Sequence, residues 1–317
     1  MAASTATATR AAVADPAYRV FPARVARTAR LCPSFVRVTF TSEELDGYGP
    51  GGFDQRLKLL LPQGSSVPPA VPEADWYGWW RALPDDVRPT MRTYTVRAFR
   101  PQLRELDVDF VLHGVDEGHA GPASSWAAGA RPGDEVWLIG PSVPGTGRMW
   151  GVEFAPPAEA RTVLLAGDET AVPAVCSILE QLDPALRVTA LLEVPHAGDA
   201  LDVPAGADVR WLPRGTGAAA RPHGQLLLEA VREVAGPLLD EVSAPAADFT
   251  DVDVDAQILW EVPEQPAAAG PECLYAWLAG ECGVVKELRR HLVRDLAVPK
   301  QSVAFMGYWR AGRAEGA

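Results

Sequence analysis

The sequence predicts two domains of different class, an antiparallel β-barrel followed by a doubly wound α/β domain. The chain has 317 residues, more than a single domain usually contains. Short strand-like segments separated by turn residues fill the first half, and strand-like and helix-like segments alternate in the second. We therefore expect a disordered tail at residues 1–15, the barrel domain at 16–155 and the α/β domain at 156–317.

Composition narrows the class of function. Apolar residues make up 48% of the chain and the net charge is −12. Residues 1–150 hold sixteen basic and sixteen acidic residues, whereas residues 151–317 hold thirteen and twenty-five. The acidic second half argues against binding to nucleic acid or an anionic membrane. No signal-peptide pattern and no apolar run of membrane-spanning length occur, so we expect a cytoplasmic monomer.

The four cysteines do not indicate a metal centre. They lie at positions 32, 176, 273 and 282 and form no C-x-x-C pair. The Cys and His spacing does not match a zinc or iron–sulfur site. We therefore expect free thiols in a reducing compartment and no protein-bound metal.

The segments of the first half are rich in β-branched and aromatic residues. Strands are predicted at 19–21, 35–40, 54–61, 94–96, 106–113 and 134–141. Pro62 ends the third of them. A stretch that contains Trp76, Trp79 and Trp80 precedes the fourth strand and is predicted to be a surface loop with a short helical turn.

Residues 92–97 have the sequence RTYTVR. They place two arginines, one tyrosine ring and two threonine hydroxyls on one short strand. Alternation along the strand would put Arg92, Tyr94 and Val96 on one face, and the other three residues on the opposite face. A planar ligand that bears phosphate suits this group, because the ring can stack and arginines bind phosphate. An ordinary strand with solvated arginines explains the same spacing.

Residues 121–126, with the sequence GPASSW, predict a loop that enters a helix. Free backbone N–H groups and the positive end of the helix dipole suit a pyrophosphate there. Such helix starts are common, so on its own this segment also fits a plain helix cap.

The second half predicts strands at 161–168, 187–194, 209–212, 273–281 and 303–309, and helices at 170–182, 225–234 and 284–296. Gly167 and Asp168 end the first of these strands, and ligands of open α/β sheets bind at such carboxyl ends. Ala279 and Glu281 end a similar strand. A helix-capping role would explain these residues equally well, and the G-x-G-x-x-G fingerprint is absent. The acidic segment near 236–256 reads as a solvated insertion.

Four groups of residues in this order resemble the siderophore-interacting proteins, a family of flavin-dependent ferric-siderophore reductases. They are RTYTVR at 92–97, HG and GPASSWA within 113–127, GDETAVPA at 167–174, and YAWLAGE at 275–281 with FMGYWRAG at 305–312. The resemblance spans nearly the whole chain. It implies a ferredoxin-reductase-like architecture with an FAD-binding barrel and a C-terminal domain that binds NADPH or NADH.

The resemblance also implies roles for individual residues. Arg92 and Arg97 would hold flavin phosphate or ribityl oxygens, and Tyr94 would pack on the isoalloxazine. The residues implied on the flavin side are Arg92, Thr93, Tyr94, Thr95, Val96, Arg97, His113, Gly121, Pro122, Ala123, Ser124 and Trp126. Those implied on the nicotinamide side are Asp168, Glu169, Thr170, Ala279 and Glu281. The flavin itself would carry the chemistry, so no catalytic side chain is assigned.

For the siderophore, the resemblance implies Lys58, Arg148 and Trp309. Lys58 would sit at the flavin mouth and attract an anionic ligand over about 8–10 Å. The family often has a basic residue after the Gly-Pro pair at 140–141, whereas this chain has Ser142. This departure leaves the siderophore selectivity open. Arg214 is a candidate for a 2′-phosphate contact, but its spacing does not distinguish it from a solvated loop arginine.

The implied reaction transfers a hydride from NAD(P)H to FAD and electrons from the flavin to Fe(III) in a siderophore, so that Fe(II) leaves. One alternative is a flavin reductase with another acceptor, such as ferredoxin, a quinone or a simple iron chelate. Another is a non-catalytic siderophore-binding iron chaperone. Ferredoxin as a partner that donates electrons is a further possibility that the sequence leaves open.

Overall fold

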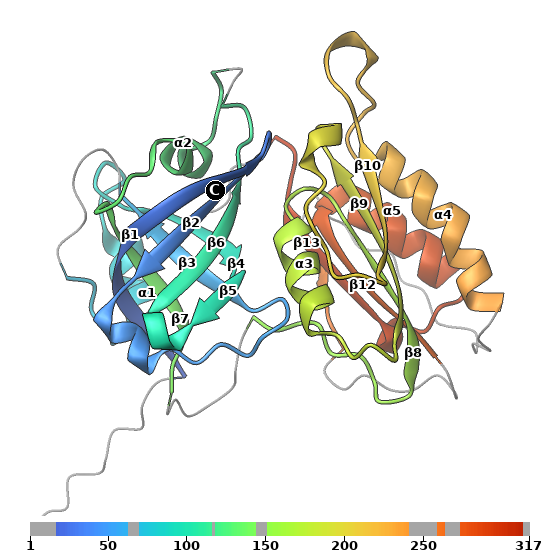
Figure 1. Ribbon diagram of the computed structural model, residues 1–317, viewed down its shortest axis with the longest axis horizontal. Coiled ribbons are helices and arrows are strands. Elements are labelled where there is room, and N and C mark those ends of the chain that lie inside the picture. The colour runs from blue at the N-terminus through green and yellow to red at the C-terminus, as the bar shows by residue number, and fades with distance from the viewer. Residues whose placement is uncertain are drawn as a thin grey trace, which may run out of the picture.

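The structure is a computed structural model that describes residues 17–62, 70–115, 118–143, 151–240, 259–263 and 273–312. It has a curled antiparallel sheet followed by a mostly parallel sheet covered by helices, and the two lie side by side (Figure 1). The predicted fold class and its order along the chain are confirmed. The predicted tail, Arg148 and most of the acidic segment lie outside the described residues, and the domain boundary at 155/156 stays a prediction.

The first sheet has seven strands in the order β4-β3-β7-β1-β2-β6-β5. They are β1 (Tyr18–Cys32), β2 (Phe35–Thr41), β3 (Arg56–Leu61), β4 (Thr90–Thr95), β5 (Ala98–Arg100), β6 (Glu105–Val111) and β7 (Glu135–Pro141). The two edge strands, β4 and β5, follow each other in the chain with only Val96 and Arg97 between them, so the sheet curls to bring its edges together. The amides of Val96 and Arg97 donate to the carbonyls of Gln55 and Asp107, 2.7 and 2.9 Å away, which draws the edges together.

The inside of this curl is an apolar core. Phe21, Phe40, Leu59 and Phe110 are fully buried there, because every second residue of these strands points inward. Two helices lie against the sheet, α1 (Trp76–Ala82) and α2 (Pro122–Gly129). Short 3₁₀ turns occupy Glu43–Gly47 and Pro101–Leu103.

The second sheet has six strands in the order β10-β9-β8-β12-β13-β11, and its pairings are parallel except that of β11. Its strands are β8 (Ala160–Gly167), β9 (Arg187–Val194), β10 (Asp208–Pro213), β11 (Trp260–Glu261), β12 (Cys273–Glu281) and β13 (Val303–Trp309). Helix α3 (Val172–Gln181) packs on one face; α4 (Gln225–Asp240) and α5 (Cys282–Arg289) pack on the other. The strand order reverses between β8 and β12, where such sheets bind ligands.

Most predicted elements are present, but several differ. Strand β1 extends to Cys32, beyond the predicted strand at 19–21, and β5 and β11 have no predicted counterpart. The tryptophan-rich stretch forms α1, a seven-residue helix, rather than a loop with a brief turn. The helix predicted over 284–296 is α5 followed by a π-helical segment at Arg290–Asp295. Helix α4 extends through Pro237 to Asp240, beyond the predicted end at 234. The second sheet also carries 3₁₀ turns at Ala197–Asp199, Gly217–Ala219 and Lys300–Ser302.

Polar side chains join the two sheets. Ser34, just before β2, donates its amide and hydroxyl to Asp199, each at 2.8 Å. Ser177 of α3 donates to the carbonyl of Phe53 at 2.6 Å. Asp54 is fully buried and accepts from Trp277 Nε1 at 3.0 Å. These bonds fix the barrel-like sheet against α3 and β12.

Candidate functional site

The first part of the candidate site is the crevice at the carboxyl ends of β8 and β12. Two glycines bring the backbones close together there. A Cβ on Gly167 would lie 2.6 Å from the carbonyl oxygen of Ala279. Gly280 has a φ of +148°, and a Cβ on it would lie 2.6 Å from Asp168 Oδ2. Both positions therefore require glycine for steric reasons.

Asp168 is the centre of this crevice, and three of the predicted residues converge on it. Its Oδ1 accepts from the Thr170 amide at 2.9 Å. Its Oδ2 accepts from the Glu281 amide at 2.8 Å and from Trp309 Nε1 at 2.9 Å. Burial, together with the neighbouring Glu169, raises the pKa of Asp168. The donors around it nevertheless match a carboxylate, which only accepts hydrogen bonds.

Glu169 continues the network. Its carboxylate takes two hydrogen bonds from Arg214, at 2.7 and 2.8 Å. Burial alone would raise the pKa of Glu169, but the hydrogen bonds from Arg214 and the nearby His223 ring, whose Nε2 lies 3.7 Å from Oε2, outweigh it and hold the pKa well below the usual range. Arg214 also contacts Glu193 at 3.2 Å. The arginine considered for a 2′-phosphate is therefore committed to two buried carboxylates.

His113 links this crevice to the first sheet. Its Nδ1 lies 3.6 Å from Glu169 Oε1. The His113 amide donates to Ser124 Oγ of α2 at 3.3 Å, and that hydroxyl donates to the Val111 carbonyl at 3.0 Å. The fold thus brings together three predicted residues, which are His113 after the end of β6, Ser124 of α2 and Glu169 of the crevice.

The N-terminus of α2 is open to a ligand. Gly121 is its N-cap residue with extended backbone, Pro122 follows, and no side chain caps the helix. No atom lies within 4 Å of where a Gly121 Cβ would be. The first-turn N–H groups have no partners within the helix, so they suit an anion. Trp126 instead packs inward, stacked on Phe40 with ring centroids 6.2 Å apart.

The predicted strand motif lies on β4 and just beyond it. The Tyr94 ring packs on Phe110, with centroids 4.4 Å apart, while part of the residue stays accessible. Thr95 and Val96 are buried. Arg92 is half-buried, and its Nη1 donates to the Met91 carbonyl at 2.8 Å. The Tyr94 ring is thus held in place by Phe110, and the residue is not fully covered.

Arg97 lies in a different setting from that implied. Its Nη1 donates to Glu180 Oε2 of α3 at 2.7 Å, and its Nε lies 3.6 Å from Asp109. Burial alone would lower its pKa, but Glu180 and Asp109 raise it. In this structure Arg97 ties the first sheet to α3, and a phosphate contact from it stays a prediction.

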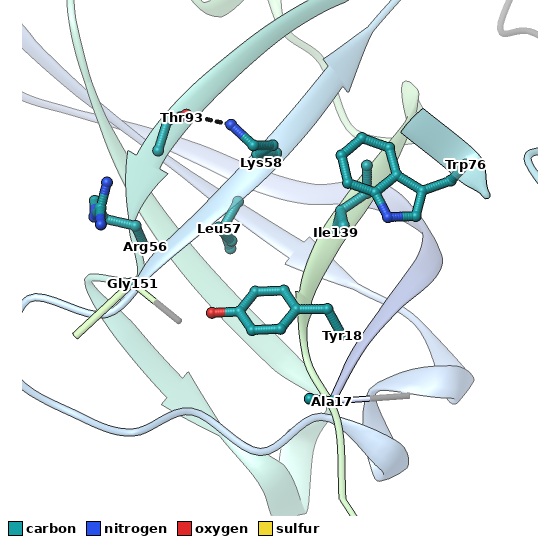
Figure 2. Close-up of a pocket in the computed structure, with 9 residues that line it drawn as sticks. All are labelled: Ala17, Tyr18, Arg56, Leu57, Lys58, Trp76, Thr93, Ile139 and Gly151. Atoms are coloured by element: carbon teal, nitrogen blue, oxygen red, sulfur yellow. Dashed lines mark hydrogen bonds between the residues drawn. The ribbon is translucent and has the colours of Figure 1, made fainter. Parts of the chain in front are cut away.

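A pocket of about 560 Å³ opens on the other face of the motif (Figure 2). Lys58 and Thr93, cross-strand partners on β3 and β4, line it and are joined by a 3.1 Å hydrogen bond from Nζ to Oγ1. The remaining lining residues are Ala17, Tyr18, Arg56, Leu57, Trp76, Ile139 and Gly151. Trp309 lies with Asp168 instead, so the residues implied for the siderophore do not form one group.

Several residues here escaped sequence reasoning. His223 and Glu193 join the crevice from segments without a motif, and Tyr18 and Trp76 line the pocket. Trp76 belongs to the tryptophan-rich stretch, which was a usable signal. The other three offered none. Among the described residues, no group of His, Cys, Asp and Glu is arranged to hold a metal.

The residues present fit FAD. The uncapped α2 N-terminus suits its pyrophosphate, the partly exposed Tyr94 suits its isoalloxazine, and both belong to the first domain. A curled antiparallel sheet before a doubly wound sheet is also the fold of a ferredoxin reductase of carbazole 1,9a-dioxygenase, with a TM-score of 0.57 and 13% identity over 92% of this chain and 70% of that one. The molecule thus has the ferredoxin-reductase-like fold, with residues that fit FAD.

Comparison with known proteins narrows the class to a family. Residues 24–145 match the siderophore-interacting FAD-binding domain, and residues 160–312 match the siderophore-interacting protein family. The siderophore-interacting protein SipS of Aeromonas hydrophila is 30% identical, with a TM-score of 0.61 over 95% of each chain. The chain belongs to the siderophore-interacting protein family.

Two relatives carry names that describe an activity. The ferric vibriobactin reductase ViuB of Vibrio cholerae is 28% identical over 94% of this chain and 92% of its own. The NADPH-dependent ferric-chelate reductase of Escherichia coli is 28% identical over 90% and 91%. Together with the FAD-binding domain and the fold, these relatives support an oxidoreductase. Within the parts that the structure describes, no helix has the length and apolar character to cross a membrane.

Proposed function

We propose that the protein is an FAD-dependent reductase that takes a hydride from NAD(P)H and passes electrons to Fe(III) in a siderophore, releasing Fe(II). The main supporting observation is that His113 Nδ1 lies 3.6 Å from Glu169 Oε1. This contact joins the predicted flavin side to the crevice at the carboxyl ends of β8 and β12. The names of the Vibrio cholerae and Escherichia coli relatives support the same reaction. A cytoplasmic location and a monomeric state stay predictions.

On the flavin side, the first sheet and α2 would share the work of binding. Gly121, Pro122, Ala123 and Ser124 would surround the pyrophosphate, with backbone N–H groups from all but Pro122, which has none. Arg92 would contact phosphate or ribityl oxygens, and Tyr94 would support one face of the ring system. When bound, FAD accepts a hydride and can release electrons one at a time.

On the nicotinamide side, the crevice would orient the pyridine nucleotide. Asp168 fixes Thr170, the Glu281 amide and Trp309 in one arrangement. Gly167 lets the Ala279 backbone pack against it, which closes the base of this crevice. A network held by this many hydrogen bonds changes little on binding, so its role would be positioning.

The siderophore would bind at the pocket beside Thr93. This residue belongs to the flavin motif and also lines the pocket with Lys58, on the face of β4 opposite Arg92 and Tyr94, so a ligand there would lie across the strand from the flavin. Lys58 and Arg56 would attract an anionic chelate. No protein ligand to iron is needed, since the metal stays within its chelate as substrate.

Anaerobic reduction of the purified protein tests the proposal. The flavin absorption should bleach on addition of NADH or NADPH and return on addition of a ferric siderophore, with Fe(II) trapped by ferrozine in equal electron count. Lys58→Gln should slow the return more than the bleaching. Protein purified without flavin, and unable to take it up, would contradict the proposal. Faster return with quinone or ferredoxin would favour a different acceptor.

A further inference from the structure

The loop between β8 and α3 differs from the loop that usually receives a dinucleotide. In the common fold, glycines after the first strand let a diphosphate approach the N-terminus of the next helix. In this chain Asp168 and Glu169 follow Gly167, and both acidic residues are buried. Carboxylate oxygens only accept hydrogen bonds and repel phosphate oxygens. A diphosphate that binds in this crevice therefore needs a cation beside the two carboxylates.

The two cationic side chains that the second domain sets against these carboxylates differ in what they offer a ligand. Arg214 is turned inward, because it bonds to Glu169 at 2.7 and 2.8 Å and to Glu193 at 3.2 Å, and its side chain is only 13% exposed. His223 lies at the edge of the same group. Its Nε2 is 3.5 Å from Asp168 Oδ2 and 3.7 Å from Glu169 Oε2.

The His223 ring is held with part of its surface open. Its Nε2 is buried, yet its side chain is 26% exposed, so the accessible atoms belong to the rest of the ring. The ring packs edge-to-face on Trp309, with centroids 5.1 Å apart. The chain next to it is fixed, because the Gly224 and Leu227 amides donate to Glu193 at 2.6 and 3.0 Å. A ring fixed in this way is preformed for a ligand.

The groups that face His223 favour its charged form. Burial lowers its pKa and the Arg214 charge also lowers it, but Glu169 and Asp168 outweigh both and raise the pKa above the ordinary 6.5. His113 reaches Glu169 from the first sheet, at the other carboxylate oxygen. The imidazolium of His223 therefore persists to a higher pH than that of a solvated histidine, and it is lost at alkaline pH.

We propose that the His223 imidazolium binds the diphosphate of the pyridine nucleotide, so that nucleotide affinity falls as the pH rises. The contact would be a charge-assisted hydrogen bond from Nδ1, the ring nitrogen that does not face the carboxylates. The inference rests on the proposed function, because it concerns the nucleotide side of the same site. It adds a binding residue from a segment without a motif, and a proton that is taken up with the ligand.

Titration of the oxidised, flavin-loaded protein with ADP-ribose tests this without electron transfer. This probe carries the diphosphate and lacks the nicotinamide. Calorimetry from about pH 6 to 9, in two buffers of different ionisation enthalpy at each pH, gives the affinity and the protons taken up. Wild-type affinity should fall about tenfold across this range, with net proton uptake on binding.

Two substitutions separate the charge of His223 from its shape. His223→Gln keeps a polar side chain without the charge, so it should bind about tenfold more weakly at the acidic end, show no pH dependence and take up no proton. His223→Lys keeps a charge over the whole range, so its affinity should stay nearly constant with pH.

His291→Gln is the matched control. His291 also lies beside a carboxylate, with Nδ1 3.6 Å from Asp295, but it belongs to the π-helical segment beyond α5 from the crevice. This variant should keep the wild-type affinity and its pH dependence.

Three results would overturn the proposal. They are an ADP-ribose affinity in wild type that does not change with pH, a wild-type pH dependence that persists in His223→Gln, and equal weakening at both ends of the range in that variant, which indicates a structural role. If His223→Gln does not fold, His223→Lys decides, because an affinity that still falls with pH would exclude His223 as the titrating group.

The same titration separates this inference from the proposed function. The expected pH dependence of ADP-ribose binding without NAD(P)H-driven bleaching of the flavin would remove the reductase function and leave the diphosphate contact intact. Bleaching by NADH together with a pH-independent ADP-ribose affinity would remove the contact and leave the reductase function intact.

Discussion

At the scale of single residues, Arg92 gives the most direct test of flavin binding. It is half-buried on β4, next to the ring of Tyr94 in the predicted motif. Arg92→Ala should lose most of its FAD while keeping its fold, because a charge-assisted contact to phosphate or ribityl oxygens contributes about 1.5–3 kcal/mol, roughly a tenfold to hundredfold loss of affinity. Flavin absorbance per protein and far-ultraviolet circular dichroism measure the two effects.

Arg104→Ala is the control for this variant. Arg104 follows the motif in the same domain, but its side chain is 47% exposed and pairs with exposed Asp46 at 2.6 Å. It should keep full flavin occupancy. Full occupancy in Arg92→Ala as well would move the site away from β4.

His223 makes a pH-dependent contribution to stability. Burial alone would lower its pKa, but Glu169 and Asp168 outweigh burial and raise it above the ordinary 6.5. Of the charged groups that contact this cluster, Arg214 opposes the rise. A raised pKa stabilises the fold fully below 6.5, and this stabilisation is lost as the pH rises through the folded value.

Urea unfolding of wild type and His223→Gln over about pH 5.5 to 9 measures this contribution. The stability difference between them should be largest at the acidic end and should shrink as the pH rises. A difference that grows with pH would mean that His223 is buried neutral and that its carboxylate neighbours do not govern it.

The sequence predicts several of these site residues, but it does not predict which residues they contact. Asp168, Thr170 and Glu281 follow predicted strand ends, so the edge of the sheet brings them together. Arg97 and Arg214 were both read as phosphate contacts, yet each is bound by carboxylates distant in the chain. Pairings of this kind depend on tertiary packing, which spacing along a strand does not report.

At the scale of elements, the junction of β8 and β12 depends on Gly280. Its φ of +148° is strained for any other residue, and a Cβ would meet Asp168. Gly280→Ala should lower the free energy of unfolding by about 1–3 kcal/mol and displace Asp168 from its partners. Chemical denaturation measures the loss. Gly236→Ala in α4, where a Cβ meets nothing within 4 Å, should not destabilise the protein, and equal losses would contradict the steric argument.

The elements themselves were largely predictable. Period-two alternation marks β2, β3, β6 and β7, and strand–helix alternation marks the second sheet. The misses have local causes. Trp76–Ala82 is rich in aromatic residues, whose helix propensity is low. The helix forms nevertheless, because its cap and its packing against the sheet stabilise it. The two-residue strand β11 is too short to give any periodic signal.

At the scale of the whole molecule, Asp54 joins the two sheets. Its buried carboxylate accepts from the amides of Glu153 and Phe154, each at 3.0 Å, and from Trp277 Nε1. Asp54→Ala would leave these donors buried without an acceptor, so we expect a loss of about 3 kcal/mol. Asp46→Ala, which removes an exposed carboxylate, should leave the denaturation midpoint unchanged.

Differential scanning calorimetry also reports whether the sheets unfold together. If Asp54→Ala splits one transition into two, the carboxylate couples the domains; if the midpoint is unaltered, the junction depends on other contacts. The sequence indicated two domains from length and pattern, but not this junction. A buried aspartate between strand residues carries no signal of a tryptophan more than two hundred positions away.

The pairing of β3 with β4 has a consequence for how such a protein diversifies. Leu61 and Thr90 are cross-strand partners, so the segment between them leaves and re-enters the sheet at one point. That segment supplies Trp76 to the pocket, whereas the RTYTVR motif begins only after it returns. Insertions, deletions or recombination in the segment between Leu61 and Thr90 can therefore change the ligands that the pocket binds. They leave unchanged the register in which β3 pairs with β4, which carries the RTYTVR motif. On the proposed function, substrate range and electron transfer would thus depend on separate segments of one chain.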